Sequence, residues 1–372
     1  MNILLKLYPR LNLGDDLFLK IICERYPNIN FYLIAPDEYH AINKWQNLHI
    51  LNNKINKSWV NKVKRFLFKK INFKLYQKQL QAIYFDQLKD EFNKIDGFVS
   101  IGGSIFMERY PNIYFDPEIA YYNLINKELV DKPKFFIGCN FGPYYTKDYL
   151  DEYKNIFFHA KDVCFREEFS LNLFNSVLDN VRLAPDVVFG MDVKINEKNS
   201  KSVGFSIITT RDNIDENLYV SKYIELIKSY LEDEFEVFLF SFCKEEGDED
   251  IIEKISSGLP SNKLVQKIYY KGNIDEFLNI YSKVSLMYCG RFHAMILSMM
   301  FEQQIFPITY SNKMLNVLKD ISYEGSTIDL QNFYQINIHD TKKNIALNYY
   351  NINQIKFQAE DQFKMLDLLL QR

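Results

Sequence analysis

The chain has 372 residues, of which 47% are apolar and 16% aromatic, and it carries a formal net charge of −3. This length suits about two domains of roughly 150 residues each, and the apolar fraction is enough to fill a core in both. Because acidic and basic residues are interspersed, the overall charge gives no reason to expect nucleic acid as a partner.

The cysteines and the hydropathy pattern limit the class of protein further. Five cysteines are scattered singly, without a CxxC pair or a regular spacing, which argues against a zinc site and against a disulfide framework. No run of about 18 apolar residues occurs, so no membrane span is predicted. We therefore expect a protein of the reducing cytoplasm. The cysteines are Cys23, Cys139, Cys164, Cys243 and Cys289.

Short β-rich runs alternate with helical stretches in both halves of the chain. NILLKL, NFYLIA and GFVSIGG belong to the first series, and VGFSIIT, FEVFLFSF and KVSLMYCG belong to the second. This alternation predicts an α/β protein with parallel sheets covered by helices. The polar stretch MDVKINEKNSKS separates the two series, so we predict domains at residues 1–195 and 196–345. The segment 346–372 has apolar residues at helical spacing and is predicted to return to the first domain as a helix.

Ligands of open α/β sheets bind at the carboxyl ends of the strands, and two such domains are expected to face each other across a cleft there. The first strand is followed by NLGDD, where Asn12, Gly14 and Asp15 precede an apolar helix. Glycine permits close approach of the backbone, and the free amides of a helix start attract anions. Asp15 or Asp16 could equally serve only as the N-cap of this helix.

The segment 56–81, in the first half of the chain, is rich in lysine and arginine and also contains Trp59, Phe66, Leu67 and Phe68. A basic amphipathic helix of this kind can lie on an anionic bilayer. It can equally be a solvated helix that covers the core. The first alternative predicts a peripheral contact with the inner face of the membrane.

Two further strands of the first half end in small residues. Gly102 and Gly103 follow one strand, and Asn140 and Gly142 follow the next. A single glycine turn is weak evidence for a site. Three strand ends in one half of the chain at which glycine exposes the backbone favour a ligand site. Each glycine lets a ligand approach the backbone without meeting a side chain.

Charged residues follow the last strands of the first half. Arg166 ends the strand in DVCFREEFS, although most arginines are solvated surface charges. Pro185 and Asp186 in APDVVF are typical of a turn before a short helix.

The stretch CGRFHAMILSMM in the second half places Gly290, Arg291, Phe292 and His293 between a strand and a helix. The helix is apolar or small nearly all round, which predicts that it is buried. An arginine and a histidine at the start of a buried helix are costly unless an anion or another acceptor meets them. His293 could also be a core histidine whose hydrogen bonds are satisfied within the protein.

Taken together, these motifs resemble the polysaccharide pyruvyl transferase family. The matching elements are NLGDD, IGGSIF, IGCNFGP, FREEFS, APDVVF and GRFHAMILSMMFEQQIFPITYSNK, in family order from residue 12 to about 313. Two positions depart from the family pattern: the glycine stretch is GGS where a third glycine is common, and Phe292 stands where leucine is common. The resemblance implies two Rossmann-like domains in the GT-B arrangement. It also implies phosphoenolpyruvate as donor and a pyruvate ketal on two hydroxyls of a sugar as product.

The resemblance also implies roles for particular residues. Arg166, Arg291, Phe292 and His293 match positions that contact phosphoenolpyruvate, and we expect Arg291 and His293 to be catalytic. Arginine suits a carboxylate or a phosphate, and it can offset charge on the departing phosphate. Histidine titrates near neutral pH and can supply or shuttle a proton. No metal or cofactor is required.

The acceptor implied by the resemblance is a sugar of a surface polysaccharide, such as an exopolysaccharide or capsule, or of its lipid-diphosphate-linked precursor. We expect the first domain to bind this acceptor and the second to bind the donor. The residues expected on the acceptor side are Asn12, Gly14, Asp15, Gly102, Gly103, Asn140 and Gly142.

Two other functions stay open. A glycosyltransferase of the same two-domain plan would use a nucleotide sugar and would need a carboxylate that binds ribose. Asp275 and Glu276 are available in the second domain, but they look like ordinary charges of a helix N-terminus. A non-enzymatic carbohydrate-binding protein would keep its ligand affinity when the arginines and the histidine are replaced.

Overall fold

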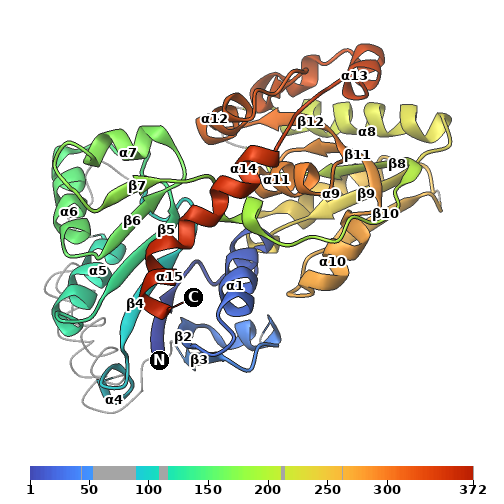
Figure 1. Ribbon diagram of the computed structural model, residues 1–372. Coiled ribbons are helices and arrows are strands. Elements are labelled where there is room, and N and C mark those ends of the chain that lie inside the picture. Colours follow the sequence, from blue (N-terminus) through green and yellow to red (C-terminus); the bar gives the residue numbers. More distant parts are fainter. Residues whose placement is uncertain (43, 53–88, 109–115, 211–213, 262, 372) are drawn as a thin grey trace, which may run out of the picture. The chain divides into compact units, whose positions relative to one another are not determined.

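The computed structural model describes residues 1–42, 44–52, 89–108, 116–210, 214–261 and 263–371 (Figure 1). The basic segment 56–81 lies outside these residues. The chain divides into two compact units. The first unit comprises Met1–Pro9, Leu19–Val187 and Glu360–Arg372, and the second comprises Arg10–Phe18 and Val188–Ala359.

The first unit contains a parallel seven-stranded sheet with the order β3-β2-β1-β4-β5-β6-β7. The chain moves outward from β1 in one direction and then returns to add β4 on its other side, which is the strand order of a Rossmann fold. The point where the order reverses lies between β1 and β4. The strands are β1 (Asn2–Lys6), β2 (Asn30–Ala35), β3 (Leu48–Asn52), β4 (Gly97–Ile101), β5 (Lys134–Cys139), β6 (Asp162–Phe165) and β7 (Val181–Leu183).

Aromatic side chains fill the core on one face of this sheet. Phe98 of β4 and Phe136 of β5 pack edge to face with ring centroids 6.1 Å apart, and Phe136 also contacts Phe157 at 5.0 Å. Phe157 belongs to α6, so this helix covers the sheet together with α5 and α7. The helices and helical turns assigned to this part are η1 (Asp37–Ile42), α4 (Lys89–Phe92), α5 (Pro117–Glu128), α6 (Lys147–Phe158), α7 (Glu168–Phe174), η5 (Glu360–Phe363) and α15 (Lys364–Leu370).

The second unit contains a parallel six-stranded sheet with the order β10-β9-β8-β11-β12-β13. Counted from β8, the order is again that of a Rossmann fold, and it reverses between β8 and β11. Both units are therefore Rossmann-like, which confirms the predicted α/β class. The strands are β8 (Asn199–Ser206), β9 (Glu236–Ser241), β10 (Val265–Tyr269), β11 (Val284–Cys289), β12 (Gln304–Thr309) and β13 (Ile328–Asp329).

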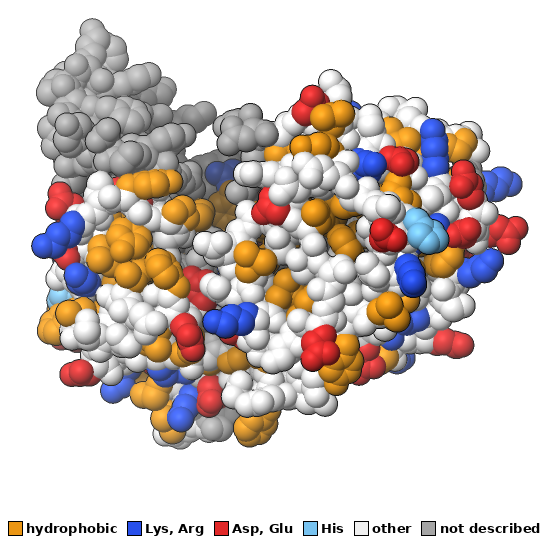
Figure 2. All heavy atoms as spheres, turned by 90° about the horizontal axis from the view of Figure 1, so that it is seen from above, with side chains coloured by type: hydrophobic (Ala, Val, Ile, Leu, Met, Phe, Trp, Pro, Cys, Tyr) orange, Lys and Arg blue, Asp and Glu red, His pale blue; other side chains and the backbone are white. Residues whose placement is uncertain are grey.

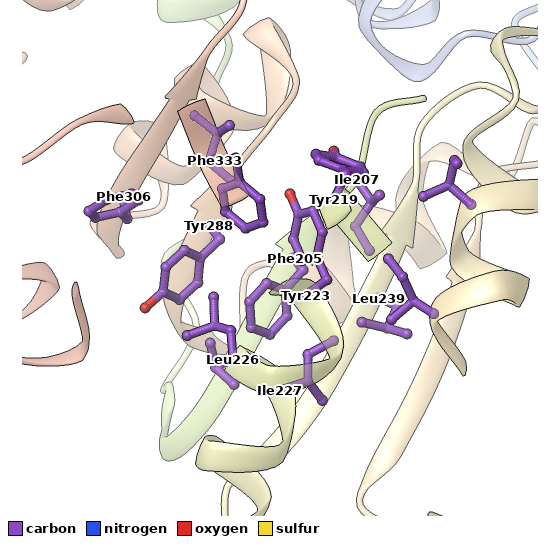
Figure 3. Close-up of a cluster of buried hydrophobic side chains, with 14 of the residues drawn as sticks. Phe205, Ile207, Tyr219, Tyr223, Leu226, Ile227, Leu239, Tyr288, Phe306 and Phe333 are labelled. Carbon is purple, nitrogen blue, oxygen red and sulfur yellow. The ribbon is translucent and has the colours of Figure 1, made fainter. Parts of the chain in front are cut away.

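The core of the second unit is built in the same way (Figure 3). Phe205 of β8 stacks on Tyr288 of β11 with centroids 4.9 Å apart, and Tyr223 of α8 lies 4.3 Å from Phe333. Helices α8 and α9 and the turn η4 thus cover one face of this sheet. The helical elements are α8 (Glu216–Glu232), η3 (Lys244–Glu246), α9 (Asp248–Ser257), α10 (Ile274–Tyr281), α11 (Phe292–Met300), α12 (Asn312–Asp320), η4 (Leu330–Gln335), α13 (Ile338–Ile345) and α14 (Asn353–Ala359). The turn η2 (Val187–Gly190) spans the boundary between the units.

Helix α1 (Leu13–Arg25) begins among residues of the second unit. The Leu13 amide donates to the Phe242 carbonyl at 3.0 Å, and the Tyr270 hydroxyl donates to the buried Asp16 at 2.7 Å. These bonds explain why residues 10–18 group with the second unit, although their place in the sequence predicted the first domain. The main boundary also differs, since it falls after Val187 rather than after residue 195.

The C-terminal segment returns to the first unit, as predicted, but only from Glu360 onward. Its fully buried Gln362 accepts a hydrogen bond from the Gly138 amide at 2.8 Å. The same side chain donates to the carbonyls of Ala184 at 2.7 Å and Pro185 at 2.9 Å. A single amide therefore links the end of β5 to the chain that follows β7.

Replacing Gln362 by alanine is expected to lower the free energy of unfolding by about 3 kcal/mol, because several buried backbone groups would lose their partner. Denaturation by guanidinium measures this loss. Gln358→Ala is the matched control, since Gln358 is exposed on α14 and should change stability little. An equally small effect at Gln362 would show that the returning segment is held by its other contacts, such as the ion pairs of Arg25 with Glu360 and Asp367.

Three further properties bear on the predictions from sequence. All five cysteines are buried free thiols, and burial raises the pKa of Cys289 to about 12. Within the described part of the chain, no helix is long and apolar enough to cross a membrane. On the face shown in Figure 2, lysine and arginine side chains are mixed with aspartate and glutamate, without a continuous patch of one sign.

Candidate active site

The chain turns sharply where β11 ends, at the point where the order of the second sheet reverses. The Gly290 amide donates to the Ser206 carbonyl at 3.0 Å and to its hydroxyl at 2.9 Å, and the Arg291 amide reaches the same hydroxyl at 3.2 Å. A Cβ atom at Gly290 would lie only 2.5 Å from the Ser206 carbonyl oxygen. Glycine is therefore needed here, and Arg291 becomes the N-cap residue of α11.

Helix α11 is buried, as its sequence predicted. Residues 294–300 are fully inaccessible to solvent. The Tyr281 hydroxyl donates to the Ala294 carbonyl at 2.8 Å and fixes the first turn of the helix. The start of α11 consequently presents backbone amides at the carboxyl edge of the sheet, where anions bind favourably.

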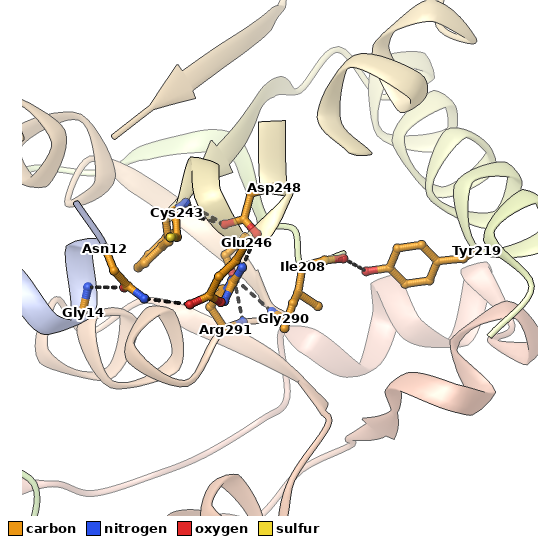
Figure 4. A network of polar contacts seen from close by, with 11 residues as sticks. Asn12, Gly14, Ile208, Tyr219, Cys243, Glu246, Asp248, Gly290 and Arg291 are labelled. Carbon is orange, nitrogen blue, oxygen red and sulfur yellow. Dashed lines mark hydrogen bonds and ion pairs between the residues drawn. The ribbon is translucent and has the colours of Figure 1, made fainter. Parts of the chain in front are cut away.

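Two carboxylates meet the guanidinium of Arg291, and Figure 4 shows the three side chains converging. Arg291 Nη1 donates to Glu246, and Nη2 donates to Asp248. Burial disfavours a charge at this place, but the two carboxylates outweigh it and raise the pKa of Arg291, which therefore stays protonated. Arg291 Nε is buried without a hydrogen-bond partner among the described residues. The protein itself thus supplies an acceptor for each Nη atom of Arg291.

Neither carboxylate was among the residues predicted from sequence. They lie in SFCKEEGDED, directly after β9, at the same edge of the sheet as Arg291. An acidic cluster that follows a buried strand was the signal that could have found them. Without the structure, however, nothing distinguishes Glu246 and Asp248 from the neighbouring exposed acids.

His293 lies in the first turn of α11 and packs against the start of α1. Its ring contacts Phe18 edge to face at 5.3 Å and Phe292 at 5.1 Å. A Cβ atom at Gly14 would lie 2.0 Å from His293 Nδ1, so the Gly14 backbone lies directly against the ring. His293 is half-buried.

The start of α1 is capped by Asn12, whose Oδ1 accepts from the Gly14 amide at 3.0 Å. Asn12 Nδ2 also donates to Glu246 at 3.1 Å. The alternative that Asp15 or Asp16 caps this helix is therefore wrong, because both follow the cap within the first turn. Asp16 is buried and accepts from Tyr270, whose pKa is raised by burial and by the Asp16 charge. Asp15 is half-buried in the same turn.

The structure thus brings Asn12 and Gly14 to Arg291 and His293 within the second unit. From sequence, Asn12, Gly14 and Asp15 were predicted to lie in the first domain, on the acceptor side. That prediction could not foresee that the start of α1 bonds to the end of β9 rather than to its own sheet.

Replacing Gly14 by alanine is expected to lower the stability of the protein by about 1–3 kcal/mol, because the new methyl group would displace the His293 ring. At an ordinary helix position the same change would stabilise the helix by up to about 1 kcal/mol. Thermal or chemical denaturation of Gly14→Ala, His293→Ala and the double variant measures the steric clash between the new methyl group and the His293 ring. If the loss of stability comes from this clash, the double variant is more stable than the sum of the single effects predicts. Purely additive effects would place the strain elsewhere.

A second polar cluster surrounds Arg166 in the first unit. Arg166 Nη1 donates to Asp186 at 2.7 Å, and both side chains are almost fully buried. Nη2 donates to Asn140 Oδ1 at 2.6 Å and reaches the Ser104 hydroxyl at 3.5 Å. A Cβ atom at Gly103 would lie 2.4 Å from Nη1, so only glycine leaves room for the guanidinium.

Residues from three strand ends therefore meet around Arg166. The sequence predicted that Gly103 and Asn140 would lie at one sheet edge, but it did not predict that the Arg166 guanidinium would occupy the space beside Gly103. Gly102 and Gly142 are instead needed for the conformation of the backbone, because their φ angles of 133° and 102° favour glycine. Asp186 stands in the turn before η2, as predicted, but it is also the counter-ion of Arg166. That second role was missed.

The residues of both clusters fall within one continuous stretch of the chain that matches a known family. A family model described as polysaccharide pyruvyl transferase matches residues 12–312. The chain belongs to this family. The matched stretch includes the Arg166 cluster and the Arg291 cluster.

A sequence relative and two solved structures are similar to this pyruvyl transferase family member over nearly its whole length. The amylovoran biosynthesis protein AmsJ of Erwinia amylovora is 23% identical, over 94% of this chain and 89% of its own. Among solved structures, Anabaena HepE, in complex with UDP and glucose, has a TM-score of 0.58 at 11% identity, and the match covers 100% of both chains. A UDP-GlcNAc 2-epimerase of Methanocaldococcus jannaschii has a TM-score of 0.58 at 13% identity, over 99% of both chains. These likenesses establish a GT-B-like fold.

Two remaining sequence-predicted candidates can be placed. Asp275 and Glu276 lie in the first turn of α10, as expected of helix N-terminal charges, and Glu276 accepts from Asn273 at 3.0 Å. Among the residues that the structure describes, no group of three His, Cys, Asp or Glu side chains is arranged to hold a metal ion.

Proposed function

We propose that the protein transfers the pyruvyl group of phosphoenolpyruvate to two hydroxyls of a sugar, forming a pyruvate ketal and releasing phosphate. The observation that carries this proposal is the position of Arg291 and His293 at the start of the buried helix α11, where the sheet order reverses. Rossmann-like sheets bind ligands at that point. Membership of the pyruvyl transferase family supports the same donor site.

In this proposal the donor binds in the second unit. Its anionic groups meet Arg291 and the first amides of α11, and Phe292 contributes its backbone at that helix start. Arg166 belongs to the first unit, and its assignment to the donor rests on the family resemblance. Its buried pairing with Asp186 and Asn140 holds the guanidinium in a fixed orientation, as preorganised electrostatic stabilisation requires.

The chemistry balances without a further reactant. One sugar hydroxyl attacks the central carbon of phosphoenolpyruvate, and the methylene carbon takes up a proton and becomes a methyl group. The second hydroxyl then attacks the same carbon, and the bond to phosphate breaks. Of the two hydroxyl protons, one ends on the methyl carbon and the other leaves with phosphate. We assign the proton transfer to His293, whose ring is held between Phe18 and Phe292.

The acceptor in this proposal is a sugar of a surface polysaccharide repeat unit, free or linked to a lipid diphosphate. The relative AmsJ is named for the biosynthesis of amylovoran, which supports an exopolysaccharide pathway. Asn140 of the first unit, beside Arg166, is the candidate acceptor contact. A lipid-linked acceptor would bring the protein to the inner face of the membrane.

The second candidate function is a glycosyltransferase that uses a nucleotide sugar. It is favoured by one observation, namely that HepE and the epimerase of the same fold were solved with UDP or UDP-GlcNAc. At identities of 11% and 13%, the likeness to these structures concerns the fold alone. The family match, by contrast, covers the sequence around both arginines. We therefore place pyruvyl transfer first.

A gene deletion tests the proposed function even before the acceptor sugar is identified. Deleting the gene in a cell that encodes it should remove the pyruvate ketal from the surface polysaccharide, and the wild-type gene should restore it. The ketal methyl group is measured by proton NMR of the purified polysaccharide. A polysaccharide that keeps its pyruvate, or that loses a whole sugar instead, would contradict pyruvyl transfer.

A further inference from the structure

We infer that Glu246 is an exchangeable counter-ion of Arg291, and that the carboxylate of the anionic donor takes its place. The inference deepens the proposed function and rests on it for the identity of the donor. It starts from a difficulty in the site. Burial raises the pKa of Asp248, but Arg291 and the amides of Phe242 and Cys243 act against that shift. With both carboxylates ionised, Glu246 and Asp248 present two negative charges to the single positive charge of Arg291. A further anion would then meet repulsion unless one carboxylate leaves.

The two carboxylates are held very differently. The Asp248 side chain is 0% exposed, and its second oxygen accepts from the amides of Phe242 and Cys243, each at 3.0 Å. The Glu246 side chain is 39% exposed. Moving Asp248 would strand two buried amides, whereas Glu246 can turn into water. Asp248 is thus the permanent partner, and it orients the guanidinium.

The backbone around Glu246 favours such a movement. Glu246 ends the one-turn helix η3, and Gly247 follows with a φ of 82°. Glycine is among the few residues that adopt this conformation at low cost, so the backbone changes direction between the two carboxylates. Glu246 and Asp248 therefore belong to different elements, η3 and α9, and one can shift while the other remains in place.

The contacts of Glu246 also match those that a donor carboxylate requires. One of its oxygens accepts from Arg291 Nη1, and the other accepts from Asn12 Nδ2 at 3.1 Å. When Glu246 turns away, the same two donors become available to a carboxylate of the ligand. Asn12 remains in position because its Oδ1 caps helix α1. Asn12 is thereby assigned to the donor carboxylate.

Calorimetric titration of Glu246→Ala with phosphoenolpyruvate, and separately with inorganic phosphate, tests the exchange. Since a partly exposed ion pair contributes modestly, we expect phosphoenolpyruvate to bind about fivefold more tightly than to the wild type. Glu245→Gln is the matched control. Glu245 precedes Glu246, is 57% exposed and pairs with Arg10, so its replacement removes one negative charge nearby without touching Arg291.

Thermal unfolding of two conservative variants, one at each position, separates the two carboxylates. Asp248→Asn should lower the unfolding midpoint by about 10 °C, and Glu246→Gln by less than about 2 °C. An equal loss in both variants would make Glu246 a structural partner and would overturn the inference. It would also be overturned if Glu246→Ala bound both anions more weakly than the wild type, or no more tightly than Glu245→Gln.

The probes distinguish this inference from the proposed function. Suppose that inorganic phosphate binds more tightly to Glu246→Ala than to the wild type, whereas phosphoenolpyruvate binds to no variant. This result would support Glu246 as an exchangeable counter-ion and would contradict phosphoenolpyruvate as the donor. If neither anion binds to any folded variant, both the exchange and the donor are rejected. Tighter binding of both anions supports both.

Discussion

Replacing Arg291 by alanine is expected to lower kcat/KM for phosphoenolpyruvate by about a thousandfold, because the donor loses its cationic partner in a buried site. The variant is also expected to lose about 3–5 kcal/mol of stability. Asp248 is fully buried, and without Arg291 its charge has no ionic partner of comparable strength. Steady-state kinetics and guanidinium denaturation measure the two effects.

A double variant separates the two roles of Arg291. Arg291→Met with Asp248→Asn removes both members of the buried pair, and the asparagine oxygen can still accept from the amides of Phe242 and Cys243. Most of the lost stability should return, because no buried charge is left unpaired. Activity should stay low. A stable double variant with activity near that of the wild type would show that Arg291 only supports the fold.

Replacing His293 by glutamine is expected to lower kcat by about a hundredfold or more, while the affinity for phosphoenolpyruvate changes only a few-fold. Glutamine can keep a hydrogen bond but cannot supply or accept a proton near neutral pH, and general acid–base groups contribute at about this magnitude. Phosphate release under saturating donor and acceptor measures kcat, and calorimetry measures donor affinity.

His339→Gln is the matched control for His293, since His339 is an exposed residue of α13. It should leave both quantities unchanged. Running the reaction in heavy water adds a second readout, because the proposed chemistry places one solvent-exchangeable proton on the new methyl group. A His293→Gln enzyme that turns over at the wild-type rate would remove this residue from the proton transfer.

The strand and helix pattern of this protein was predictable because each element carries its own signal. Apolar strands followed by glycines occur in both halves. The helix after Arg291 is apolar or small nearly all round, and this composition indicated its burial. Gly103 and Asn140 were correctly expected at one sheet edge, since parallel strands end on the same side.

The partners of the charged residues were not predictable, because they depend on which distant segments meet. Arg291 and Asp248 are 43 residues apart, and Arg166 and Asp186 are 20 apart. Whether an acid after a strand faces solvent or a buried arginine is decided by the tertiary packing. The start of α1 is a similar case, because its place in the second unit depends on bonds to the distant residues Phe242 and Tyr270.

Calorimetric titration of the wild-type protein with phosphoenolpyruvate, beside a panel of uridine and guanosine nucleotide sugars, is the most direct measurement of the central claim. We predict saturable binding of phosphoenolpyruvate that is lost in the stable Arg291→Met, Asp248→Asn variant, and no saturable binding of the nucleotide sugars. Binding of a nucleotide sugar without binding of phosphoenolpyruvate would contradict the claim and would make the protein a glycosyltransferase.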